Sequence, residues 1–153
     1  MQDLRELLSN LGFQNIQTYI QSGNIILSSK EDKSAIILKI EENIFSNFGY
    51  NVPVLIRTID EWKKAIDANP YANKDPKRMC FTFLNDIPTK TTFEVNGIKE
   101  DEFTIIDDVV YIYAPSGFGK TKLTNNLFER KLNVTATSRN FRTTLKLLEL
   151  SSS

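Results

Sequence analysis

The sequence contains no histidine and only one cysteine, and these shortages exclude several kinds of chemistry. Without histidine, the chain forms no Ser-His-Asp triad, no Cys-His nucleophile pair and no imidazole zinc site. Because Cys80 has no second cysteine to pair with, an intrachain disulfide is excluded as well, which suits a reducing compartment. We therefore expect a cytoplasmic protein that holds no metal and no cofactor.

The chain also lacks a long hydrophobic run. No stretch approaches the roughly 20 apolar residues that a membrane-spanning helix needs. The first residues, MQDLRELLSN, mix acids with leucines and do not form the continuous apolar segment of a signal peptide. With 153 residues, of which 41% are hydrophobic, the chain can enclose a core without a disulfide or a metal. We expect one domain over residues 1–153, with no membrane attachment.

Net charge is zero, but the charged residues are unevenly distributed. Residues 1–113 contain 12 basic and 17 acidic side chains, whereas residues 114–153 contain 7 basic and 2 acidic ones. This asymmetry indicates a basic patch that meets an anion, a nucleic acid or the acidic half of the same chain. A solvated face with internal ion pairs explains the same distribution. Nucleic acid is disfavoured, because the aromatic run MCFTFL (79–84) has no interleaved basic residues and fits a buried core.

Hydrophobic periodicity predicts helices and strands in mixed order along the whole chain. Apolar residues at helical spacing predict helices over residues 3–11, 31–48, 60–68, 121–132 and 139–150. Alternating or continuous apolar runs predict strands over residues 16–20, 24–29, 52–58 and 79–85, the last in the centre of a sheet. The run 102–114 predicts a hairpin with Asp107 and Asp108 at its turn. The pattern as a whole indicates an α+β fold.

The stretch YAPSGFGKTKL (113–123) contains a loose match to a Walker A loop from Ala114 to Thr121. Its surroundings argue against a nucleotide-hydrolysing loop. The preceding VVYIY run belongs to the predicted hairpin, and too few residues follow to supply the apolar strand ending in Asp that completes a magnesium site. A simpler interpretation is an anion-binding helix terminus that uses the Gly117 and Gly119 amides with Lys120 and Lys122.

Five stretches of the chain together resemble an uncharacterised bacterial family, domain of unknown function 1697. They are TYIQSGNIILSS (18–29), FGYNVPVLIRT (48–58), NPYANKDPKRMCFTFL (69–84), YAPSGFGKTKL (113–123) and TSRNFRTTLKLLEL (137–150). In this family the Gly-rich turn is commonly followed by Ser-Lys-Leu, where this chain has Thr121-Lys122-Leu123. The resemblance therefore explains the glycine-rich sequence of this loop without a nucleotide-binding role.

The resemblance implies an α+β fold with a ferredoxin-like, βαββαβ-type part over residues 1–85. An antiparallel hairpin and the C-terminal helices follow over residues 86–153. Members usually begin with a further strand before the first helix, and this sequence starts at or inside that helix. We therefore expect either a poorly soluble protein or an open position in the first sheet that a partner strand fills, with a homodimer through the open sheet edge as one outcome.

Basic residues recur at helical spacing near the C-terminus. Arg139, Arg142 and Lys146 are expected to share one helix face, where like charges are unfavourable unless an anion compensates them. The planar fork of arginine suits phosphate or carboxylate. We predict an oxyanion cradle that includes polar residues of the first hairpin. Its candidate residues are Ser22, Asn24, Lys120, Lys122, Arg139, Asn140, Arg142 and Thr143.

Three functional interpretations follow. The first is a cytoplasmic protein whose basic C-terminal corner binds a small anion or a phosphorylated ligand. The second is an enzyme acting on a phosphorylated or nucleotide substrate, with lysine and arginine stabilising negative charge. The third is an interaction module completed by a partner strand. For the site residues, turn chemistry at Asn24 and an ordinary solvated face at Arg142 remain open alternatives.

Overall fold

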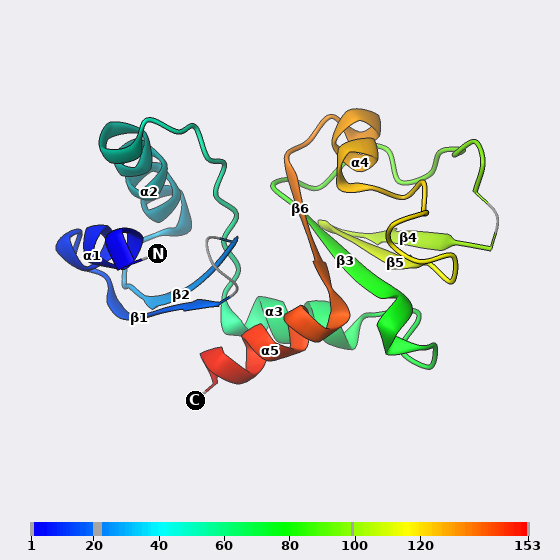
Figure 1. Ribbon diagram of the computed structural model, residues 1–153, viewed down its shortest axis with the longest axis horizontal. Helices are drawn as coiled ribbons and strands as arrows, with labels where there is room; N and C mark the ends of the chain where they lie inside the picture. The colour runs from blue at the N-terminus through cyan, green and yellow to red at the C-terminus, as the bar shows by residue number, and fades with distance from the viewer. Residues whose placement is uncertain (1, 20–22, 99, 153) are drawn as a thin grey trace. The chain divides into compact units, whose positions relative to one another are not determined.

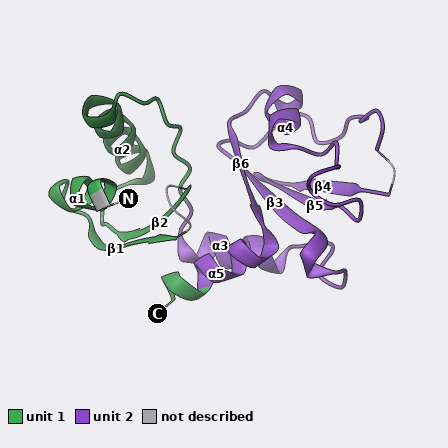
Figure 2. Ribbon diagram, in the orientation of Figure 1, with its two compact units in different colours: residues 1–56, 149–153 green, residues 57–148 purple. Residues whose placement is uncertain are grey.

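The computed structural model describes residues 2–19, 23–98 and 100–152. The chain divides into two compact units (Figure 2). Unit 1 comprises residues 1–56 and 149–153, and unit 2 comprises residues 57–148. Each unit has its own antiparallel sheet and its own helices, so the two are described separately.

Unit 1 consists of two helices and a two-stranded antiparallel sheet (Figure 1). Its elements are α1 (Gln2–Asn10), β1 (Gln14–Tyr19), β2 (Asn24–Ser28) and α2 (Lys33–Phe48). Gly49 ends α2 in the left-handed conformation, with φ of 78°, and its amide donates to the carbonyl of Phe45 at 2.9 Å. The two hairpin strands and the two helices match the helix–strand–strand–helix order predicted for this part of the sequence.

The core of unit 1 lies between its helices and its sheet. The side chains of Ile36, Ile40 and Ile44 repeat every four residues and form the buried stripe of α2. Leu8 from α1 and Phe13, which precedes β1, complete the buried cluster. Ile16, Ile25 and Leu27 from the two strands pack against it. Each element thus contributes one apolar face, which is why this short segment can enclose a core.

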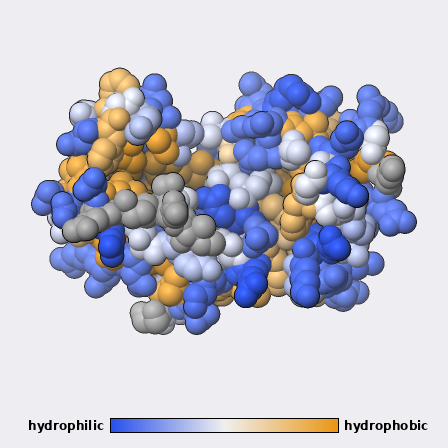
Figure 3. Space-filling model, in the orientation of Figure 1, coloured by the Kyte–Doolittle hydropathy of each residue, from blue (hydrophilic) through white to orange (hydrophobic). Residues whose placement is uncertain are grey.

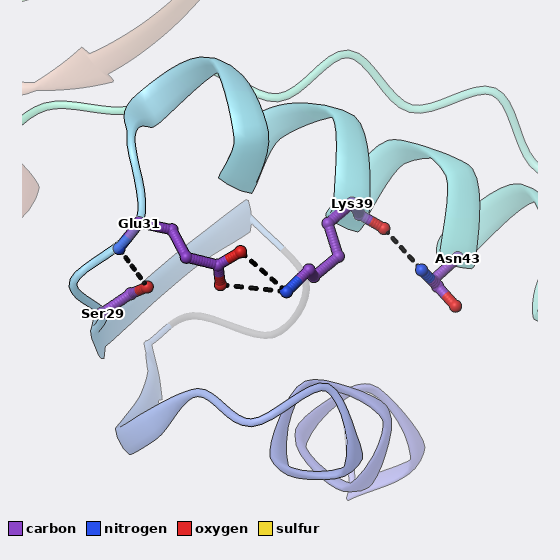
Figure 4. A network of polar contacts seen from close by, with 4 residues as sticks. All are labelled: Ser29, Glu31, Lys39 and Asn43. Carbon is purple, nitrogen blue, oxygen red and sulfur yellow. Dashed lines mark hydrogen bonds and ion pairs between the residues drawn. The ribbon is translucent and has the colours of Figure 1, made fainter.

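Polar contacts tie α2 to the turn before it (Figure 4). The Nζ of Lys39 contacts both carboxylate oxygens of Glu31, at 2.8 and 2.9 Å. Glu31 is held in turn by its own amide, which donates to the Oγ of Ser29. Because Lys39 also lies 5.5 Å from the ring centroid of Phe13, its side chain covers the edge of the core.

The outer side of α2 is apolar as well. Leu38, Phe45 and Phe48 are 57%, 53% and 37% exposed. The space-filling view shows hydrophobic atoms gathered at the upper left, where Figure 1 places α2 (Figure 3). Even so, none of the helices in the described part of the chain has the length and apolar character to cross a membrane.

Unit 2 is built on a four-stranded antiparallel sheet in the order β4-β5-β3-β6. The strands are β3 (Met79–Leu84), β4 (Glu102–Ile106), β5 (Val109–Tyr113) and β6 (Ala136–Asn140). The helices are α3 (Ile59–Asp67), the short 3₁₀ helix η2 (Pro76–Arg78), α4 (Asn125–Leu132) and α5 (Phe141–Ser151), of which residues 149–151 are assigned to unit 1. The two edge strands of the sheet are therefore β4 and β6, and β3 lies between β5 and β6.

The alternation of side chains along β3 decides where the helices pack. Phe83 stacks on Trp62 of α3 with ring centroids 4.4 Å apart, and Phe81 lies 5.6 Å from Phe141 of α5. Leu84 points to the other face and joins the cluster that contains Phe128 of α4. Helices α3 and α5 consequently cover one face of the sheet and α4 covers the opposite face (Figure 1).

Several predictions from the sequence are confirmed. The fold is α+β with two antiparallel sheets, β3 is a central strand, and residues 102–114 form the β4–β5 hairpin. Asp107 occupies the turn with φ of 53°, a conformation that Asp tolerates. The ferredoxin-like detail is not confirmed, because β3 pairs with β5 and β6 rather than with a strand of unit 1. The boundary between the two compact units lies after residue 56.

Other boundaries differ from the prediction. Residues 52–58 do not form a strand. The helix expected from residue 121 begins at Asn125, behind an N-cap at Thr124. The helix expected from Arg139 begins at Phe141, because pairing with β3 holds residues 136–140 in a strand. The prediction that Arg139 shares a helix face with Arg142 is therefore wrong.

Substitution of Phe128 tests how much the aromatic packing between α4 and the sheet contributes to the stability of unit 2. The Phe128 ring is fully buried and lies 5.3 Å from Phe103 and 5.9 Å from Phe93. Phe128→Ala should lower the free energy of unfolding by about 4 kcal/mol, since it leaves a cavity between the sheet and the helix. Phe118→Ala is the matched control, because Phe118 is 42% exposed. Urea unfolding measures both; equal losses in the two variants would contradict the packing described.

Candidate functional site

The loop that resembles a Walker A motif uses its own amides for turn formation. The amide of Gly117 donates to the carbonyl of Ala114 at 2.9 Å, and the amides of Lys120 and Thr121 donate to the carbonyl of Gly117. The following helix starts only at Asn125. A phosphate loop uses free amides at a helix N-terminus, whereas the Gly117 amide is already bonded within the turn and no helix begins directly after Gly119.

A buried carboxylate anchors this loop. Asp101 is 7% exposed, and its two oxygens accept from the amide of Ser116 at 3.1 Å and from its hydroxyl at 2.5 Å. Burial alone would raise the pKa of Asp101, but hydrogen bonds from the Ser116 hydroxyl, the Thr121 hydroxyl and the Ser116 amide outweigh it and lower the pKa. Asp101 therefore remains ionised and fixes the loop just before Lys122.

Lys122 lines a surface depression of about 480 Å³. Two segments line the depression, residues 94–96 and residues between Thr121 and Lys131. Arg130 and Lys131 join Lys122 in its lining, so three cations border one depression. This volume falls in the range of small-molecule sites, which is roughly 300–1,000 Å³.

The position of each cation follows from the local chain. Lys122 lies against Gly97, where a Cβ atom would stand 3.4 Å from the Cε of the lysine. Gly97 has φ of 79°, so the backbone of this segment curves in a way that glycine allows. Arg130 and Lys131 occupy the last turn of α4, where positive charge is favourable to the helix dipole. Thr124, Leu127 and Lys131 all line the depression, which therefore runs along α4.

The two arginines predicted as anion-binding residues, Arg139 and Arg142, do not line this depression. Arg142 is exposed on α5, which packs on the face of the sheet opposite α4, so the structure does not bring it together with Lys122. Arg139 lies on β6, and its Nη1 donates to the Oγ1 of Thr137 at 2.7 Å and to the carbonyl of Ser138 at 2.8 Å. Burial lowers the pKa of the Arg139 guanidinium. Arg139 thus has hydrogen-bond partners within its own strand.

The remaining predicted residues have local roles. The side chain of Asn140 accepts from the amide of Thr143 at 2.8 Å, which caps α5. The Nδ2 of Asn24 donates to the carbonyl of Tyr19 at 3.1 Å and closes the hairpin of unit 1. Ser22 lies outside the described residues. Lys120 is exposed in the loop and is absent from the described lining of the depression.

Arg130 and Lys131 line the depression, although the sequence patterns did not single them out. Both contribute to the basic excess of residues 114–153, which was the available signal. Glu94 was also overlooked, because residues 91–95 adopt no helix or strand and have no periodicity to show where they lie. Within the described residues, no group of three or more His, Cys, Asp or Glu side chains is arranged to hold a metal ion.

The fold and the depression define an α+β protein with a basic surface site beside one helix. Comparison with known families then identifies the group. Residues 1–111 match the model of the family described as Protein of unknown function (DUF1697), and the chain belongs to that family. The match ends before Lys122, so the residues that border the basic side of the depression lie beyond it.

A solved structure shares the fold. The conserved bacterial protein SP0830 from Streptococcus pneumoniae is similar to this chain with a TM-score of 0.75 and 19% sequence identity. The similarity covers 99% of this chain and 88% of that protein. No curated protein matches the chain.

Asp101 provides a test of the loop anchor. Its lowered pKa means that its contribution to stability is present above roughly pH 4, the usual range of an unfolded Asp, and is lost as the pH falls through the lower folded value. Asp101→Asn should reduce the free energy of unfolding at pH 7 by about 2 kcal/mol, because charge-assisted hydrogen bonds are lost. The substitution should also remove the loss of unfolding free energy that protonation of Asp101 causes at low pH.

Urea unfolding between pH 3 and pH 7 measures both effects. Asp86→Asn is the control, since Asp86 is exposed and its Oδ1 accepts from the amide of Ile87, a bond that Asn can also accept. An Asp101→Asn protein with the same stability and the same pH profile as the native protein would contradict the anchoring role.

Proposed function

We propose that this protein binds a small anionic or phosphorylated ligand in the depression along α4. The observation that carries the proposal is the gathering of Lys122, Arg130 and Lys131 around one concave surface. Arginine offers paired donors to phosphate oxygens, and lysine offers a mobile point charge. The reducing compartment suggested by the lone Cys80 supports a cytoplasmic setting for this binding.

An enzyme acting on a phosphorylated or nucleotide substrate remains the alternative for the same depression. The three cations would stabilise charge that develops on a phosphoryl group. Glu94 supplies the one carboxylate in the described lining, and a carboxylate can serve as a general base when it reaches the reacting proton. Turnover of a phosphorylated compound that depends on Glu94 would favour this alternative, whereas binding without turnover favours the first proposal.

Charge removal in the depression tests the binding proposal. Lys122→Ala and Arg130→Ala should each weaken binding of inorganic phosphate by about tenfold, which corresponds to the loss of about 1.4 kcal/mol of binding free energy. Isothermal titration calorimetry at low ionic strength measures the change, because salt screens exposed charges. Added salt should weaken the native interaction as well.

Arg142→Ala is the matched control, since Arg142 is an exposed cation on the opposite side of the sheet. It should bind phosphate as the native protein does. The proposal fails if Arg142→Ala loses as much affinity as Lys122→Ala, or if both depression variants bind phosphate with native affinity.

A second candidate function rests on unit 1. Residues 50–57 run without helix or strand, although Val54 and Ile56 alternate toward the same core as Ile25 and Leu27 of β2. The amide of Val54 donates to a side chain, the Oε2 of Glu41, at 2.8 Å. An extended apolar segment near a two-stranded sheet is the kind of place where an additional strand can pair. This supports an interaction module, with a homodimer as its simplest form.

The homodimer is tested by oligomeric state and by amide exchange. Light scattering coupled to size-exclusion chromatography should show a concentration-dependent dimer. In the dimer, hydrogen exchange at the amides of residues 50–52 and 55 should slow by about tenfold or more, because strand pairing protects amides. A monomer at all concentrations, or a dimer with unchanged exchange in this segment, would rule out pairing there.

A further inference from the structure

The lining of the depression carries charges of both signs. Lys122, Arg130 and Lys131 border it together with Glu94, which comes from a separate segment of the chain. Glu94 is exposed, and among the described residues it takes part in no ion pair. A carboxylate thus lines the same concave surface as three cations and remains accessible to solvent and to a ligand.

The backbone at Glu94 is held in place by its neighbours. Phe93 packs 5.1 Å from Phe103 and 5.9 Å from Phe128, measured between ring centroids. Val95, on the other side of Glu94, packs against the same core cluster. Because both flanking residues are anchored, Glu94 keeps its place at the rim of the depression.

The lining between the charged groups is partly apolar. Val95 and Leu127 contribute to it, so a short carbon chain can lie there out of water. A simple phosphate gains from the cations but is repelled by Glu94. A phosphate compound with an ammonium group at its other end gains from the cations and from Glu94, since the carboxylate accepts a charge-assisted hydrogen bond.

We infer that Glu94 is a specificity-determining residue, and that the depression selects phosphomonoesters that also carry an ammonium group. The inference rests on the proposed anion-binding function and adds the second half of the ligand. Ethyl phosphate and 2-aminoethyl phosphate are suitable probes, because they differ in size by one terminal group and only the second has the ammonium.

Isothermal titration calorimetry of the two probes is the test. The native protein should bind 2-aminoethyl phosphate about tenfold more tightly than ethyl phosphate. In Glu94→Gln this preference should disappear, and ethyl phosphate should bind severalfold more tightly because its repulsion is removed. Glu102→Gln is the control, since Glu102 is exposed at the start of β4 and is not among the described lining residues; it should retain the native preference.

The outcomes separate this inference from the function on which it rests. If the native protein binds both probes equally, the inference is overturned, while Lys122-dependent phosphate binding would leave the proposed function standing. If Glu94→Gln keeps the native preference, the selecting residue is not Glu94 and the inference is likewise overturned. If neither probe nor inorganic phosphate binds the native protein, the proposed function fails and the inference fails with it.

Discussion

Burial of β3 on both faces is the constraint from which the arrangement of unit 2 follows. Phe81 and Phe83 are covered by α3 and α5, and Leu84 is covered from the other side by α4. A strand that is apolar on both faces requires two layers of helices. The consequence for function is a separation of charge, because the cations beside α4 and those of α5 are placed on opposite sides of one sheet.

The basic depression depends on this layering and on the segments that cross the α4 face. Asp101 fixes the loop that leads to Lys122, and Phe93 anchors the irregular segment that carries Glu94. Neither Asp101 nor Phe93 lines the depression. Each holds in place a segment whose residues do. The depression is therefore a product of two loops and of helix α4, all fastened to the same core, which explains how exposed lysine and arginine side chains come to border one concavity.

Local patterns in the sequence predicted local structure well. The β4–β5 hairpin was predictable because its alternation and its Asp107-Asp108 turn lie within 12 residues of each other. Strand β6 was not, because its sequence ATSRN is polar and its conformation depends on pairing with distant β3. Lys122 was predicted as a site residue, whereas Glu94 required knowledge that an aperiodic segment lies against α4. What the sequence could not provide was the side of the sheet on which each cation lies.

The central claim is that anion binding belongs to the α4 face and not to the predicted cradle of arginines on β6 and α5. The most direct measurement is a titration with inorganic phosphate followed by the backbone amide resonances of the protein. The account predicts shifts concentrated in residues 94–97 and 121–131, with little change in residues 137–146. Shifts concentrated in residues 137–146 instead would contradict it.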